Sequence, residues 1–202
     1  MKISNLVSSL SLAAGALALP SMLDTRQQKD KFFTVHPAVN KSKCMGVLGG
    51  KVVVGAFVDV YDCNGSATQK WSWGAPSDIY ALSQIYVVDT SGKKLCVDIP
   101  PLSGFPDAEK DIVNGAKLVL KNCKKQDDFA GMDFGRPTDP SANGAIKYST
   151  WFVPDPEEGL FGQKCVDLTG GKTENKNVLQ LWNCNEDYKK PWKNQIWSVT
   201  EV

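Results

Sequence analysis

The residues best suited to bind a small polar ligand lie near the C-terminal end of the sequence. Residues 177–197 place the amides Gln180, Asn194 and Gln195 close in sequence to Trp182 and Trp197. Tryptophans suit a packed core, but a core has no use for amides that lack hydrogen-bond partners. An aromatic face beside amide groups suits a ligand that is partly apolar and partly hydrogen-bonding. The stretch therefore predicts a core position and a binding position side by side.

Groups that could carry out catalysis are scarce. His36 is the only histidine and has no motif around it, so a histidine-dependent nucleophile is not expected. Two clusters of carboxylates could supply the acid pair of a glycosidase. They lie in loops rich in proline and glycine, where solvated acidic residues are the ordinary finding: Asp107, Glu109, Asp111, and Asp155, Glu157, Glu158. We expect no catalytic site, no metal site and no cofactor.

The first residues have the composition of a secretory signal peptide. Lys2 precedes an apolar run over about residues 6–19, which contains the small-residue pattern Ala-Leu-Ala at 16–18. The run is too short and too rich in small residues for a membrane span. We therefore predict that residues 1–18 are removed and that the protein is secreted. The chain has 23 basic and 22 acidic residues, so no excess charge attracts nucleic acid or an anionic membrane.

Six cysteines follow that segment, and in a secreted chain an even number favours disulfide bonds. No Cys-x-x-Cys pattern indicates zinc, and the first and third consecutive pairs have equal separations. The simplest prediction is three local disulfides: Cys44–Cys63, Cys96–Cys123 and Cys165–Cys184. N-glycosylation sequons begin at Asn40 and Asn64, which predicts that both asparagines lie on surface loops.

Three segments of the chain repeat one pattern: a cysteine, a turn-rich stretch, and an apolar strand that ends at a second cysteine. They are residues 43–71, 95–123 and 164–184. Short runs of β-branched and aromatic residues alternate with glycine, proline, asparagine and aspartate clusters, which is typical of an all-β chain. A repeat of this size cannot bury its own apolar face. We therefore expect the three copies to share one core around an approximate threefold axis.

One tryptophan per repeat is placed to fill that core. The first and third repeats continue to Gln-x-Trp sequences that end at Trp71 and Trp197. We match the second repeat, across a polar insertion, to Ser149-Thr150-Trp151. These matches predict a mature N-terminal segment at 19–30 and repeats at about 31–77, 78–153 and 154–202.

Repeats with a Cys-Val-Asp-like start, an internal cysteine pair and a terminal Gln-x-Trp resemble those of the ricin B-chain-like lectins. The resemblance covers about residues 31–202. It implies a β-trefoil of twelve strands with one potential sugar pocket per repeat. It also implies galactose or N-acetylgalactosamine as the default ligand.

The resemblance assigns a complete sugar site to the third repeat. Asp167 would accept hydrogen bonds from sugar hydroxyls, Asn194 would donate to one, and Gln195 would orient the aspartate. Gln180 and Trp182 share one strand face, so that Trp182 would form the stacking platform. The chemistry agrees, because a pyranose has an apolar C–H face and a rim of hydroxyls that suits charge-assisted hydrogen bonds.

The first repeat departs from this pattern, and we expect an inactive or weak, vestigial sugar site there. Gly46 takes the place of the aspartate, which removes the main acceptor. Tyr61 keeps the aromatic position, Asp59 the polar one, and Thr68 with Gln69 the Asn-Gln position.

The second repeat departs in another way, and we expect no sugar there. Asp98 is present, but Lys121 replaces the aromatic residue and Val119 the polar one. Tyr148 and Ser149 stand at the Asn-Gln position. Asp98 and Lys121 are expected to form a structural or surface ion pair.

The sequence therefore predicts a secreted lectin that binds glycans or glycoproteins mainly through its third repeat. One other class stays open. Proteins of this fold also act as protease inhibitors or protein-binding modules through exposed loops, and the long loops at 100–111 and 124–147 could serve that role.

Overall fold

The structure is a computed structural model, and it describes residues 30–74, 83–102, 110–124, 133–139, 142–149, 164–185, 187 and 190–202. Several predictions concern residues outside this part: the signal peptide, Trp151, most of both long loops, and the carboxylates at 107, 109, 155, 157 and 158. In the part that is described, no helix is long and apolar enough to cross a membrane.

The described residues form short strands joined by turns, as the alternating apolar runs predict. The strands are β1 (Phe33–Pro37), β2 (Lys43–Val47), β3 (Val58–Asp62), β4 (Ser72–Trp73), β5 (Ile85–Val88), β6 (Lys94–Asp98), β7 (Val119–Asn122), β8 (Asp133–Phe134), β9 (Lys147–Ser149), β10 (Lys164–Asp167), β11 (Asn177–Val178), β12 (Gln180–Asn183) and β13 (Trp197–Glu201). Four single-turn 3-10 helices lie between them: η1 (Leu48–Gly50), η2 (Ala67–Gln69), η3 (Thr169–Gly171) and η4 (Lys193–Gln195).

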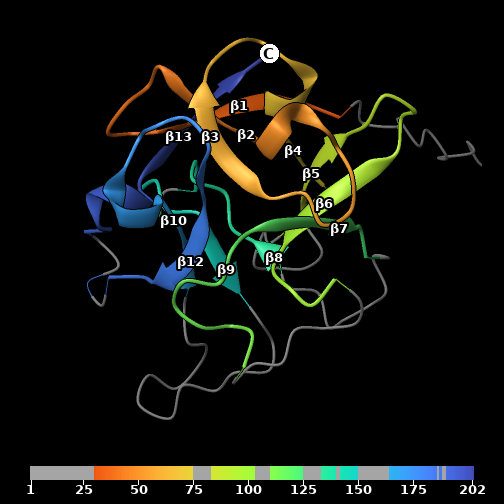
Figure 1. The fold of residues 1–202 in the computed structure, drawn as a ribbon. Helices are drawn as coiled ribbons and strands as arrows, with labels where there is room; N and C mark the ends of the chain where they lie inside the picture. The colour runs from red at the N-terminus through yellow and green to blue at the C-terminus, as the bar shows by residue number, and fades with distance from the viewer. Residues whose placement is uncertain are drawn as a thin grey trace, which may run out of the picture.

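The strands pair antiparallel in small sheets. Their orders are β1-β13, β4-β5-β6-β7, β12-β10-β9-β8 and β11-β3-β2. The last strand, β13, pairs with the first, β1, so the two ends of the described chain lie side by side (Figure 1). The orange, green and blue parts of the ribbon occupy three sectors around a common centre, one for each third of the chain (Figure 1).

A ring of three backbone hydrogen bonds marks the threefold centre. Val58 N donates to Leu118 O over 3.0 Å, Leu118 N to Leu179 O over 3.1 Å, and Leu179 N to Val58 O over 2.9 Å. The three side chains are fully buried. Leu179 separates β11 from β12, which is why thirteen strands are described where twelve were expected. No repeat could form this ring alone, so the three repeats share one core, as predicted.

Equivalent tryptophans fill the core in the first and third repeats. Trp71 Nε1 donates to Met45 O over 2.9 Å, and Trp197 Nε1 donates to Val166 O over 3.0 Å. Each acceptor follows the first cysteine of its repeat, so the two indoles are anchored in the same way. Both tryptophans are buried, as the Gln-x-Trp spacing predicts.

The second repeat uses Phe134 at this position, which differs from our match to Trp151. Gly135 N donates to Lys147 O, and Lys147 pairs with Cys165, just as Ser72 pairs with Tyr86 and Tyr86 with Cys96. Phe134 therefore corresponds to Trp71. It is fully buried and packs on Tyr148 with ring centroids 4.9 Å apart.

These registers also move the boundary between the second and third repeats. Lys147–Ser149 is strand β9, which pairs with β10 and opens the third repeat instead of ending the second. Our match used the tryptophan and ignored pairing, because a sequence shows no strand register.

All three predicted disulfides are confirmed: Cys44–Cys63, Cys96–Cys123 and Cys165–Cys184. Each joins two neighbouring strands or their ends within one repeat. Of the two sequon asparagines, Asn64 is exposed, whereas Asn40 is half-buried. The Asn40 Oδ1 atom accepts hydrogen bonds from Ser42 N and Ser42 Oγ, which closes a tight turn.

Candidate functional site

The third repeat brings its five predicted site residues together. Asp167 ends β10 and lies opposite Gln180 on β12 in the antiparallel register. Trp182 lies two residues further along β12, and η4 carries Asn194 and Gln195. The alternation along β12 is the expected one, because Leu179 and Leu181 are buried in the core whereas Trp182 remains half-buried.

Three amides converge on the Asp167 carboxylate. Gln180 Nε2 donates to Oδ1 over 3.0 Å, and Gln195 Nε2 donates to Oδ2 over 3.2 Å. Asn194 Nδ2 also donates to Oδ2. Gln195 Nε2 is held in turn by Asn183 O at 2.9 Å. Gln195 therefore links the Asp167 carboxylate to the backbone at the end of β12.

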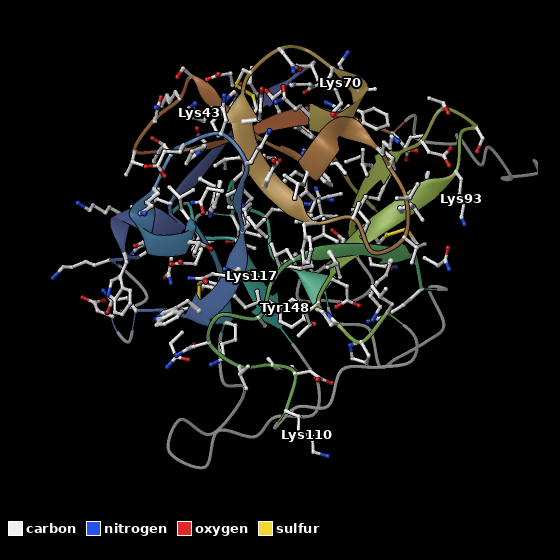
Figure 2. All side chains as sticks on the ribbon, viewed as in Figure 1. Lys43, Lys70, Lys93, Lys110, Lys117 and Tyr148 are labelled. Atoms are coloured by element: carbon white, nitrogen blue, oxygen red, sulfur yellow. A yellow bond between two sulfur atoms is a disulfide. The ribbon has the colours of Figure 1, made fainter. Side chains whose placement is uncertain are left out.

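Sequence reasoning missed Lys117, which lies beside this cluster. Its Nζ donates to Gln180 Oε1 over 3.0 Å and to Thr169 Oγ1 over 3.1 Å. Figure 2 shows Lys117 against β12, and the backbone of Lys117 forms a bridge with that of Gln180. Lys117 belongs to the second repeat, so no motif within one repeat could have indicated it.

Hydrogen bonds from the three amides occupy most of the acceptor positions of the Asp167 carboxylate. A carboxylate offers about four acceptor positions, and the amides occupy three of them. One further donor can bind directly, and a second would require an amide to turn away. Burial raises the pKa of Asp167, whereas the amides and the charge of Lys117 oppose that rise.

An exposed tryptophan beside η4 was also missed. Trp192 directly precedes η4 and leaves 45% of its surface exposed. It offers a second aromatic face close in sequence to Asn194. The sequence alone does not show that Trp192 is exposed whereas Trp197 is buried.

The second repeat holds its aspartate in a closed cluster. Asp98 Oδ2 lies 3.2 Å from Lys121 Nζ and 3.4 Å from Lys124 Nζ. Asp98 Oδ1 accepts from Tyr148 Oη at 3.0 Å and from Ile99 N at 2.8 Å. The expected Asp98–Lys121 pair is therefore present, and it is buried.

The first repeat contains a pocket of about 290 Å³. Asp59, Tyr61 and Gln69 line it, together with Lys176 from the third repeat. Gln69 Nε2 donates to Asp62 O over 3.0 Å, which matches the bond from Gln195 to Asn183 O.

Comparisons with known proteins bear on the fold. Neither family models nor curated proteins match the chain. Solved structures do match, among them the designed threefold-symmetric protein ThreeFoil, at 15% identity and a TM-score of 0.53, covering 85% of this chain and 99% of that one. The chain is a β-trefoil.

Two natural structures match the trefoil over most of its length. The Rhizoctonia solani agglutinin is 14% identical with a TM-score of 0.51, covering 96% of this chain and all of that one (100%). The β-trefoil lectin of the Vibrio vulnificus hemolysin/cytolysin, solved with N-acetyl-D-lactosamine bound, is 15% identical with a TM-score of 0.50. That match covers 86% of this chain and 96% of the Vibrio chain.

His36, the only histidine of the sequence, lies in the described part of the structure. His36 Nδ1 lies 3.0 Å from Lys43 O and against the Cys44–Cys63 disulfide, with Sγ atoms at 3.6 and 3.5 Å. Those sulfurs are covalently paired, so this cluster cannot supply thiolate ligands to a metal. The absence of enzymatic activity remains a prediction.

Proposed function

We propose that this trefoil is a secreted lectin whose third repeat binds galactose or N-acetylgalactosamine-type glycans. The observation that carries the proposal is the convergence of three amides on Asp167 beside Trp182. The amides hold the carboxylate in one orientation, so a sugar hydroxyl would meet a fixed acceptor. Trp182 offers the aromatic face that the C–H side of a pyranose requires.

The neighbouring structures support carbohydrate binding in general terms. An agglutinin and a lectin with bound N-acetyl-D-lactosamine share this fold. The three disulfides agree with an extracellular location, where disulfides persist. The choice of galactose rests on the residues that the third repeat shares with the ricin B-chain-like pattern.

A single site of this kind is expected to be weak. Asp167 has one open acceptor position, and a charge-assisted hydrogen bond contributes about 1.5–3 kcal/mol. A dissociation constant near ~1 mM corresponds to about −4 kcal/mol. Useful affinity would then come from an extended glycan or from several sites acting together.

The test is a glycan array that compares wild type with Asp167→Asn. The variant keeps the shape of the side chain but removes its charge. We expect wild type to bind terminal galactosides and the variant to lose at least about tenfold in third-repeat affinity, because a charged acceptor becomes a neutral amide. Glu201→Gln is the matched control, since it neutralises an exposed carboxylate on β13. Equal binding by wild type and Asp167→Asn would contradict the proposed site.

A further inference from the structure

The pocket of the first repeat contains a carboxylate in an unexpected place. In the third repeat, Asp167 on β10 lies opposite Gln180 on β12. In the first repeat, the same register pairs Gly46 on β2 with Asp59 on β3. The aspartate is therefore transposed to the partner strand. Asp59 and Asp167 are equally buried, at 2% exposure each.

Gly46 makes this transposition possible. A Cβ atom at residue 46 would lie 3.3 Å from Asp59 Oδ1 and 3.3 Å from Gln69 Cγ. At these distances the Asp59 and Gln69 side chains would have to shift by a few tenths of an ångström to admit even a Cβ atom at residue 46. Gly46 thus permits the Asp59 carboxylate to occupy the volume that an aspartate at residue 46 would otherwise fill.

One oxygen of the Asp59 carboxylate lacks a hydrogen-bond partner among the described residues. Among the described residues, nothing donates a hydrogen bond to its Oδ1, although the atom is buried. Asp98 and Asp167, by contrast, are surrounded by donors. Buried acceptors in folded proteins are usually satisfied, so an unpaired oxygen on a residue that lines a pocket is available to a donor from outside the chain.

The other parts of a sugar site surround Asp59. Tyr61 lies two residues along the same strand, which puts both side chains on one face, and it is 37% exposed. It can therefore stack on a pyranose as Trp182 would. Gln69, held by its hydrogen bond to Asp62 O, also lines the pocket, together with the hydroxyl-bearing residues Ser66 and Thr68.

Lys176 has an unfavourable backbone conformation at this pocket. Its φ is 72°, in the left-handed region that favours glycine. The equivalent positions in the other two repeats, three residues before Val58 and Leu118, are Gly55 at 85° and Gly115 at 90°. The lysine appears only where its side chain lines the pocket. Strain of this kind is retained at functional sites.

We propose that the first repeat is a second carbohydrate site, which binds a neutral pyranose through Asp59, Tyr61 and Lys176. Asp59 accepts from a sugar hydroxyl, Tyr61 covers the C–H face, and the Lys176 ammonium donates to a second hydroxyl. The inference rests on the proposed function of glycan binding but not on the third repeat. It replaces our sequence-based expectation that the first site is vestigial.

The test separates the two sites with Asp59→Asn, Asp167→Asn and the double variant. The probes are the methyl glycosides of galactose, N-acetylgalactosamine, glucose, N-acetylglucosamine and mannose, titrated at pH 7.5 and followed by two-dimensional amide NMR. The protein is produced without N-glycans, because the sequon residue Asn64 lines the same pocket. Amide signals of β3 and η2 report the first site, and those of β12 and η4 report the third.

We expect at least one glycoside to shift the β3 and η2 signals in wild type and in Asp167→Asn. Asp59→Asn should weaken that response at least tenfold and leave the β12 response unchanged. A first-site response without a third-site response would overturn the proposed function for Asp167 and keep this inference. An unchanged first-site response in Asp59→Asn, or none with any of the five glycosides, would overturn this inference.

The Lys176→Gly variant distinguishes a binding role of Lys176 from a purely structural one, because the two roles predict different effects on first-site affinity. Glycine suits the left-handed conformation, so the melting temperature should rise by a few degrees. First-site affinity should nevertheless fall at least about threefold, because the ammonium is lost. Lys172→Ala is the control, since Lys172 is an exposed lysine of the same loop and does not line the pocket. A Lys176→Gly variant with unchanged affinity would remove Lys176 from the site.

Discussion

The unusual pKa of Asp59 is the feature that the sequence indicated least. Burial raises the pKa of Asp59 to about 6 from 3.8, although a hydrogen bond from its own backbone N–H and the nearby Lys176 ammonium oppose the rise. An acid with a raised pKa in the folded state binds more protons when folded than when unfolded. The stability that it contributes is therefore present at low pH and is lost as the pH rises from about 4 to about 6.

This titration predicts the stability of Asp59→Asn. The raised pKa corresponds to roughly 3 kcal/mol of destabilisation above pH 6, at about 1.4 kcal/mol per pKa unit. The neutral variant should be more stable than wild type at pH 7.5, by up to that amount, and about equally stable at pH 4. Urea unfolding at the two pH values measures the difference. A variant less stable than wild type at pH 7.5 would show that the charge stabilises the fold.

Sugar binding should depend on pH for the same reason. Protonation removes the charged acceptor, and the pKa values of both Asp59 and Asp167 are raised. The charged groups that act on them are Lys176 and Lys117 respectively. First-site affinity should therefore decrease below about pH 6, which the NMR titration repeated at pH 5 measures. Equal affinity at pH 5 and pH 7.5 would contradict an ionised acceptor.

Strand pairing decided which aromatic residue belongs to each repeat. The Gln-x-Trp motif located Trp71 and Trp197, because both repeats keep the glutamine and the tryptophan. In the second repeat the β8–β9 ladder assigns the position to Phe134. The sequence at 132–134 is Met-Asp-Phe instead of Gln-x-Trp, so no motif indicated this position.

Phe134→Ala tests this assignment. A fully buried phenylalanine that contacts Tyr148 should cost about 3–5 kcal/mol of unfolding free energy when truncated to alanine. Tyr61→Ala is the control, because Tyr61 is exposed and its loss should cost less than about 1 kcal/mol. Chemical denaturation measures both. A loss below about 1 kcal/mol for Phe134→Ala would place the aromatic anchor of the second repeat elsewhere.

The trefoil presents one candidate site in its first repeat, one in its third repeat, and a closed ion cluster in its second repeat. Threefold geometry separates equivalent sites around the molecule, so a trefoil with two sites can bridge two glycan-bearing surfaces. Linked sites gain avidity of about 10²–10⁴ without new contacts. Weak individual sites would then be sufficient for binding to a dense glycan surface.

Cross-linking tests this two-site arrangement. Wild type should aggregate liposomes that carry the glycoside identified by titration, whereas Asp59→Asn and Asp167→Asn should each bind liposomes without aggregating them. Light scattering measures aggregation, and size-exclusion chromatography establishes that the samples are monomers. Undiminished aggregation by both monomeric variants would contradict one functional site in each of the two repeats.

The sequence by itself determined the repeat, the disulfides, the two tryptophan anchors and the third-repeat residues. These features depend on residue identity at short spacings along one chain segment. Tertiary structure decided the rest: Phe134 as the second aromatic, Lys117 beside Asp167, and Asp59 and Lys176 in one pocket. Each of these depends on strand register or on contact between repeats. The spacing of residues within one repeat cannot reveal either, because both arise only when the three repeats close around their shared core.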